Sequence, residues 1–94
     1  MQIDRTSIVA RNPGPVEADL ADQTVLLSIE SGSYFAVSGP ARRIWQLVGE
    51  PISVSEVLDT LMDEYDVAPA TCEAEVREFL ATLVGKGLVR VCPR

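Results

Sequence analysis

Histidine is absent from this 94-residue chain, and cysteine occurs only at positions 72 and 92. The chain therefore lacks the most frequent general base near neutral pH, and neither thiol has an evident base or cation beside it to lower its pKa. Two cysteines without a histidine or a CxxC motif do not make a zinc site or a disulfide framework. Glycine-rich phosphate loops are also missing. The composition argues against an enzyme and predicts no metal or cofactor.

Basic residues are scarce as well, because 8 Lys and Arg face 14 Asp and Glu, for a formal net charge of −6. Neutralisation of phosphates supplies most non-specific affinity for nucleic acid, so an acidic chain is poorly suited to bind it. Apolar runs such as Val25–Leu27 are far too short to cross a membrane, and residues 1–5 lack the apolar core of a signal peptide. We expect a cytoplasmic protein that binds neither nucleic acid nor membrane.

The first part of the chain is typical of β-structure. Turn residues at 12–15, 22–23 and 31–33 separate three segments of strand character, at 16–20, 24–29 and 34–37. These segments predict a small antiparallel sheet of three strands within about residues 5–38. Residues 7–10 are a weaker candidate for a fourth strand of this sheet. In the last strand the two-residue period places Phe35 and Val37 toward the helices and leaves Tyr34 partly exposed.

Three helical patterns follow, at about 39–49, 53–66 and 71–86. Ser38 is the expected N-cap of the first helix, and Ser53 with Glu56 fits a capping box at the second. The third is expected to start near Thr71, with Glu73 and Glu75 in its first turn. Its apolar stripe is wider than packing on two short helices requires, and comprises Cys72, Val76, Phe79, Leu80, Leu83 and Val84. Residues 88–91 read as a short strand or an extended tail.

These patterns predict one α+β domain over residues 1–94, a small N-terminal antiparallel three-stranded sheet followed by a three-helix winged helix-turn-helix bundle. A DNA reader of this shape would present basic side chains on its third helix. Here the polar positions of that helix are mostly acidic or neutral, namely Glu73, Glu75, Arg77, Glu78, Thr82 and Lys86. We therefore expect the winged helix-turn-helix shape without DNA as its ligand.

A strand edge offers a different kind of site. An extended peptide can add itself to an unpaired strand and gain main-chain hydrogen bonds, while side-chain pockets select its sequence. Residues 33–38 would supply that strand, and the broad stripe of the third helix would supply an apolar wall. The alternative is that the stripe belongs entirely to the core and the edge is merely protected.

The segment 32–38 followed by 41–47 (ARRIWQL) resembles the PqqD-like proteins, in which a strand end precedes an A-x-x-I-W-x-L helix. The resemblance extends from about Val16 to Val91. This chain departs from the family pattern at Phe35, Val37 and Ser38, where tyrosine, leucine and asparagine are typical. The resemblance implies a RiPP recognition element, a non-catalytic domain that binds the leader region of a ribosomally made precursor peptide and delivers it to processing enzymes.

Carried over residue by residue, the resemblance implies a peptide-binding site on one strand and one helix. The implied residues are Tyr34, Phe35, Ala36 and Val37 on the strand, and Val76, Phe79, Leu80 and Leu83 on the helix. Arg77 is a candidate salt-bridge donor to an acidic leader, or alternatively an ordinary surface residue.

The implied partners are those of stand-alone members in lasso-peptide clusters, a leader peptidase and an ATP-dependent macrocyclase. In the sibling pyrroloquinoline quinone pathway the partner is a radical SAM enzyme. Two functions of a different class stay open, an acidic winged-helix transcription regulator and a purely structural subunit of an enzyme complex. The residues also leave open the leader motif and the product class.

Overall fold

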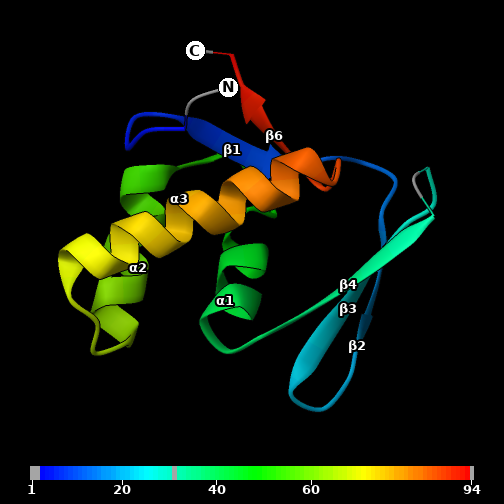
Figure 1. Cartoon of the computed structure of the whole chain (residues 1–94), viewed down its shortest axis with the longest axis horizontal. Coiled ribbons are helices and arrows are strands. Elements are labelled where there is room, and N and C mark those ends of the chain that lie inside the picture. Colours follow the sequence, from blue (N-terminus) through cyan, green and yellow to red (C-terminus); the bar gives the residue numbers. More distant parts are fainter. Residues whose placement is uncertain (1–2, 31, 94) are drawn as a thin grey trace.

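A computed structural model describes residues 3–30 and 32–93 as two antiparallel three-stranded sheets and three helices (Figure 1). One sheet has the strand order β2-β3-β4 and the other β5-β1-β6. Along the chain the elements are β1 (Ile8–Arg11), β2 (Val16–Asp19), β3 (Gln23–Ser28), β4 (Ser33–Ser38), α1 (Gly39–Leu47), β5 (Ile52–Ser53), α2 (Val54–Glu64), α3 (Pro69–Gly85) and β6 (Val89–Cys92).

The sheet β2-β3-β4 is the predicted meander. Leu26 of β3 lies opposite Phe35 of β4, and Leu27 lies opposite Tyr34. The β3–β4 connection contains Gly32 at a φ of 71°, a conformation that favours glycine. Ser31, which we also expected in this turn, lies outside the described residues.

Strand β1 does not join this meander, so the alternative of a fourth strand there is wrong. It pairs with β5 on one side and with β6 on the other, and Val9 and Ala10 are buried between them. Buried backbone groups need hydrogen-bond partners, and β6 from the far end of the chain supplies them for β1. Residues 89–92 therefore form a strand and not an extended tail.

The first residues of the three helices show which of the predicted N-caps form hydrogen bonds. Ser53 caps α2, because its side chain accepts a hydrogen bond from the Glu56 N–H at 3.1 Å. Ser38 occupies the N-cap position of α1, but its side chain makes no capping hydrogen bond. Helix α3 begins at Pro69, two residues earlier than expected, since proline is favoured in a first turn. Glu73 and Glu75 therefore lie beyond that turn, and the helix-dipole argument does not apply to them.

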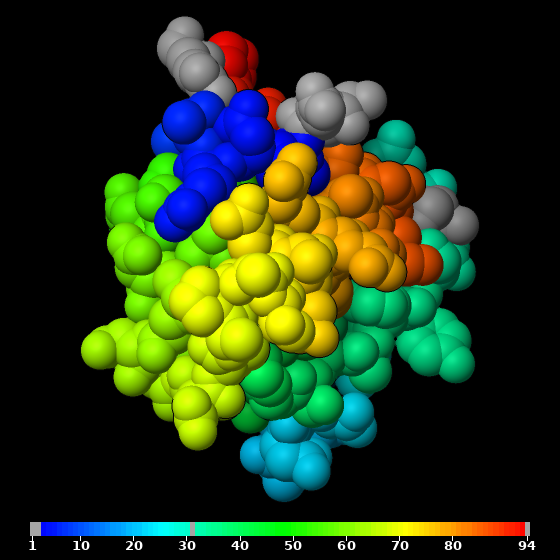
Figure 2. Space-filling model, turned by 60° about the vertical axis from the view of Figure 1, so that its left-hand side comes forward, coloured from blue at the N-terminus to red at the C-terminus, as the bar shows by residue number. Residues whose placement is uncertain are grey.

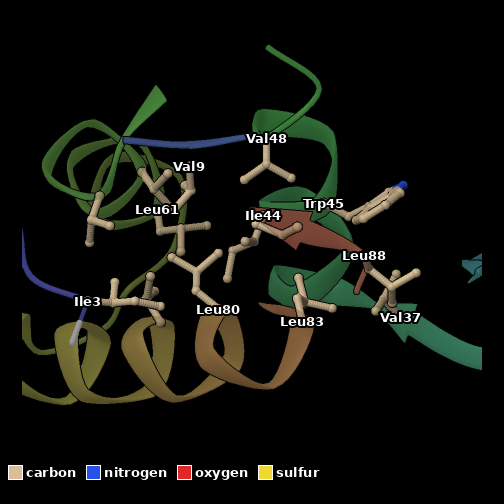
Figure 3. Close-up of a cluster of buried hydrophobic side chains, with 14 of the residues drawn as sticks. Ile3, Val9, Val37, Ile44, Trp45, Val48, Leu61, Leu80, Leu83 and Leu88 are labelled. Carbon is tan, nitrogen blue, oxygen red and sulfur yellow. The ribbon is translucent and has the colours of Figure 1, made fainter. Parts of the chain in front are cut away.

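The core fills the space between the three helices and is closed by β1 and the inner face of β4. Figure 3 shows Leu80 and Leu83 of α3 pointing into the same apolar cluster as Ile44 of α1. Leu80 and Leu83 have no exposed surface, and Val37 is only 3% exposed. Within residues 3–30 and 32–93, no helix combines the length and the hydrophobicity that crossing a membrane requires.

Candidate functional site

Strand β4 lies at the edge of its sheet. It pairs with β3 on one side. On its other side, from Tyr34 to Ser38, no neighbouring strand exists in the part of the chain that the structure describes. An edge strand presents outward-pointing N–H and C=O groups that can pair with another extended chain. The open edge required for strand addition is therefore present.

Helix α3 runs beside this strand. The ring of Phe35 lies 6.1 Å from that of Phe79, centroid to centroid, with 30° between the ring planes. The ammonium nitrogen of Lys86, just after the end of α3, lies 5.3 Å from the centroid of the Phe35 ring. In Figure 2 the helix, yellow to orange, crosses the front of the molecule with the blue-green strand along its side. Strand and helix thus meet at this pair of rings, and we call the surface between the open edge of β4 and α3 the β4–α3 groove.

One row of α3 side chains borders this groove. Glu75, Phe79, Thr82 and Lys86 follow one another at intervals of four, three and four residues, which places them on one side of the helix. Phe79 and Lys86 are half-buried, whereas Glu75 and Thr82 are exposed. The row therefore has an acidic end, an aromatic centre and a basic end.

An apolar cavity of about 210 Å³ lies next to Phe79, where α1, α2 and α3 meet. Glu75 is the charged residue in its lining, and Tyr65 contributes a phenol. The lining consists of Pro40, Ala41, Ile44, Leu61, Tyr65, Val67, Cys72, Glu75, Val76 and Phe79. A cavity of this character accepts one or two apolar side chains of a ligand. A larger hollow of about 490 Å³ beside the Asn12–Pro15 loop is formed mainly by exposed turn residues and offers no comparable apolar wall.

The strand residues divide between two faces as predicted. Phe35 is half-buried and faces α3, and Val37 is packed in the core. Tyr34 is 77% exposed on the opposite face, and Ala36 is also exposed. The edge of β4 and the ring of Phe35 therefore border the groove, whereas the side chains of Tyr34 and Ala36 face away from α3.

The helix residues divide differently from the prediction. Leu80 and Leu83 are completely buried in the core, so they support the groove wall from inside and present no surface to it. Val76 is 2% exposed but lines the apolar cavity. Phe79 alone of the four is half-buried at the groove. The apolar stripe is wide because α3 contacts several core elements. Only Phe79, at one margin of the stripe, contributes to the groove wall.

Arg77 lies on the other side of α3 from the row at the groove. Its Nε donates a hydrogen bond to the Ile3 carbonyl at 2.8 Å, and its Nη1 lies 3.5 Å from an oxygen of Glu73. In contrast, Lys86 has no carboxylate within 4.0 Å among residues 3–30 and 32–93. Lys86, and not Arg77, therefore lies beside the groove as a cation without an ion-pair partner among the described residues.

The cysteines and carboxylates do not form a reactive cluster. No group of three or more Cys, Asp or Glu side chains suited to a metal ion occurs in the described ranges. Cys72 is buried next to the apolar cavity, and burial, followed by the negative charge of Glu75, raises the pKa of its thiol. A raised pKa keeps this thiol protonated and therefore a poor nucleophile near neutral pH.

Most of the chain matches a known protein family. The family model for coenzyme PQQ synthesis protein D (PqqD) matches residues 23–89. The chain belongs to the PqqD family. The structure of "TbiB1 in Complex with the TbiA(beta) Leader Peptide" is similar to this PqqD-family chain, with 32% sequence identity and a TM-score of 0.81 over 90% of this chain and 99% of that one.

Two further solved structures share the PqqD-family fold at 24% identity. One is a lasso peptide synthetase B1 complexed with its leader peptide, with a TM-score of 0.77 over 87% of this chain and 96% of that one. The other is the solution NMR structure of the PqqD truncation of Methylobacterium extorquens PqqCD, described as a functional, stand-alone RiPP recognition element, with a TM-score of 0.76 over 94% of both chains. A comparison with curated proteins finds no significant match. The resemblance inferred from the sequence is confirmed.

Sequence reasoning missed several residues that border the groove in this PqqD-family chain. Glu75 and Lys86 were treated only as polar surface, although their spacing to Phe79 already places all three on one side of a helix. Pro40, Tyr65 and Val67 could not be found in this way, because they reach the cavity from different elements.

Proposed function

We propose that this chain is a RiPP recognition element: it binds the leader region of a ribosomally made precursor peptide by strand addition to β4, and delivers it to processing enzymes. The observation that carries the proposal is the open edge of β4 beside the Phe35–Phe79 pair. The complex of TbiB1 with the TbiA(beta) leader peptide, at 32% identity, supports it.

The groove supplies the two parts that such binding needs. Main-chain groups of β4 pair with the extended peptide, and the cavity beside Phe79 takes its apolar side chains. Each side chain that becomes fully buried contributes about 1.5–3 kcal/mol. The entropy cost of ordering a flexible peptide offsets several kcal/mol of this binding free energy. The remaining affinity is in the range of about micromolar to nanomolar.

The proposed site residues follow from the geometry of the groove. The segment from Tyr34 to Val37 supplies the backbone edge, Phe35 and Phe79 supply the aromatic contact, and Val76 lines the cavity. Leu80 and Leu83 belong to the core cluster against which Phe79 packs. Recognition by these groups needs no catalytic side chain, and we assign the chain no reaction of its own.

The enzyme partners are proposed to bind the outer face of β2-β3-β4. Val16, Leu27 and Tyr34 lie opposite one another across the three strands and are 49%, 41% and 77% exposed. Ala18, Val25 and Ala36 form the next row on the same face. Exposed apolar patches are typical of protein-binding surfaces, and this property supports the outer face as the one that the enzymes contact. In lasso-peptide biosynthesis the partners would be the leader peptidase and the macrocyclase.

A second candidate partner follows from the family description, coenzyme PQQ synthesis protein D. In that pathway the chain would present its peptide to a radical SAM enzyme. The strand edge and the groove would act in the same way, so the two candidates differ in the precursor bound and not in the site. The cytoplasmic location expected from the sequence stays a prediction.

We also propose that the three helices form a winged helix-turn-helix. Three helices accompanied by the sheet β5-β1-β6 fit a winged helix-turn-helix whose wing contains the C-terminal strand. The net charge of −6 and the acidic residues along α3 oppose DNA as its ligand. A single domain spanning residues 1–94 agrees with the shared core of helices and strands.

The test is a titration of the purified protein against the labelled leader peptide of its own precursor and against duplex DNA. We expect saturable peptide binding and no DNA binding; strong DNA affinity that falls steeply with salt would instead favour the transcription regulator. Phe79→Asp should abolish peptide binding. Ala81→Asp is the matched control, because Ala81 is exposed and lies on a different side of the same helix. Equal peptide affinity of the two variants, both folded, would exclude the groove.

A further inference from the structure

Two charged side chains lie at opposite ends of the row on α3 that borders the groove. Arg5, Arg11, Arg42, Arg43 and Arg77 each lie within 4.0 Å of a carboxylate. In the described part of the chain, Lys86 has no carboxylate within 4.0 Å and Glu75 has no cationic side chain within that distance. Both residues belong to the row that contains Phe79. A bound ligand could therefore satisfy both charges without breaking an existing ion pair.

Each of the two charges is tied to a specific place in the groove. The Lys86 ammonium lies over the ring of Phe35, in the first half of β4. Glu75 lines the same cavity as Pro40 and Ala41, which follow the end of β4, and its charge contributes to the raised pKa of Cys72 there. Strand β4 therefore runs from the basic end of the groove to its acidic end.

The distance between the two ends follows from helix geometry. Glu75 and Lys86 are eleven residues apart in the sequence. At 1.5 Å per residue this separation is about 16 Å along the helix axis. An extended peptide covers about 3.3 Å per residue, so about five of its residues span the same length.

We infer that the groove selects peptides that carry an acidic residue beside Lys86 and, about five residues away, a basic residue beside Glu75. This inference rests on the proposed function and adds the charge pattern of the ligand to it. The order of the two charges also reports the direction of the added strand. A peptide antiparallel to β4 carries the basic residue first, and a parallel one carries the acidic residue first.

The expected effect of each charge is modest because both ends of the groove are accessible to water. Exposed ion pairs contribute about two- to fivefold in affinity. Reversing one charge replaces attraction by repulsion, so we expect a loss of about tenfold at low salt. The loss should shrink as the ionic strength rises, because salt screens exposed charges.

The experiment is a selection of random 16-residue peptides displayed on phage, with the full chain as bait, followed by affinity measurements on synthetic versions of the selected peptides. For the wild-type protein we expect enriched peptides with apolar residues between one acidic and one basic residue about five positions apart. For Glu75→Lys/Lys86→Glu, which keeps the net charge, the order of the two charges should invert. The control Glu73→Lys/Arg77→Glu exchanges charges on the other side of α3 and should keep the wild-type pattern.

The outcomes separate this inference from the function on which it rests. If no peptide is enriched and the protein's own leader also fails to bind, the proposed function fails. If apolar peptides are enriched with no charge pattern, or with one that the exchange does not invert, only the charge selection is overturned. The variant Glu75→Gln/Lys86→Gln guards against misfolding of the exchange variant, since it should keep the apolar preference and lose the charge preference.

Discussion

The indole N–H of Trp45 donates a hydrogen bond to Oε2 of Glu17 at 2.8 Å, which joins helix α1 to strand β2. Arg11 of β1 completes the contact. Its Nη1 lies 3.2 Å from Oε1 of Glu17, and its guanidinium lies 4.2 Å from the centroid of the Trp45 ring. Because β2 belongs to the sheet that ends in β4, this cluster of Arg11, Glu17 and Trp45 fixes the groove-bearing sheet to the rest of the protein.

Removing the acceptor from this cluster should destabilise the fold. Glu17→Ala leaves the N–H of Trp45, a residue only 3% exposed, without its partner, and an unsatisfied buried donor costs about 1–3 kcal/mol. Glu17→Gln keeps an acceptor oxygen and should cost less. Urea unfolding followed by the fluorescence of Trp45, the sole tryptophan, measures both values. Equal losses for the two variants would show that the hydrogen bond contributes nothing.

Two neighbouring positions on α3 should separate stability from binding. Leu80→Ala removes a fully buried side chain and should lower the free energy of unfolding by about 2–5 kcal/mol. Phe79→Ala should cost less stability, because Phe79 is only half-buried, and should weaken leader-peptide binding at least tenfold. Calorimetry of binding and denaturant unfolding on both variants test this. A Phe79→Ala protein that binds normally would contradict the groove assignment.

Ser53 and Ser38 occupy the N-cap positions of α2 and α1, and substituting each gives a matched pair of variants. Ser53→Ala removes the hydrogen bond to the Glu56 N–H and should destabilise the protein by about 1 kcal/mol. Ser38→Ala removes a side chain that makes no capping bond and should change the free energy of unfolding by less than about 0.5 kcal/mol. Thermal and urea unfolding of both variants give the comparison. The reverse order of the two effects would mean that Ser38 is the working cap.

The buried thiol of Cys72 should make stability depend on alkaline pH. Its pKa in the folded protein is raised above the ordinary value of 9.0, first by burial and then by Glu75. The folded chain therefore holds this proton more tightly than the unfolded chain does. The resulting stability is fully present below about pH 9 and is lost as the pH rises through the folded value.

The measurement is the difference in unfolding free energy between the wild-type protein and Cys72→Ala across about pH 8 to 10.5, a range that brackets the ordinary thiol pKa. The difference removes the contributions of lysine and tyrosine, which titrate in both proteins. We expect the advantage of the wild type to shrink as the pH rises. A difference that stays constant over this range would mean that the Cys72 pKa is not raised.

The strand part of the candidate site was predictable because its signals are local. The alternation of Tyr34, Phe35 and Val37 fixed the two faces of β4, and the pattern around Trp45 identified the family. The charges at Glu75 and Lys86 were within reach too, since helical spacing relative to Phe79 places all three on one side. The sequence did not connect these charges with the candidate site, because the apolar stripe that indicated the site lies on the adjacent margin of the helix.

The sequence by itself determined the order of the main elements, the N-cap of α2 and the two faces of β4, because turn residues, Ser53 and the two periodicities act within a few residues of the chain. Only the tertiary structure decided that β1 pairs with β6, and that Leu80 and Leu83 are covered while Phe79 stays at the groove. Pairing between distant strands and burial on a helix depend on which other elements pack there, and neither is encoded in the local spacing of residues.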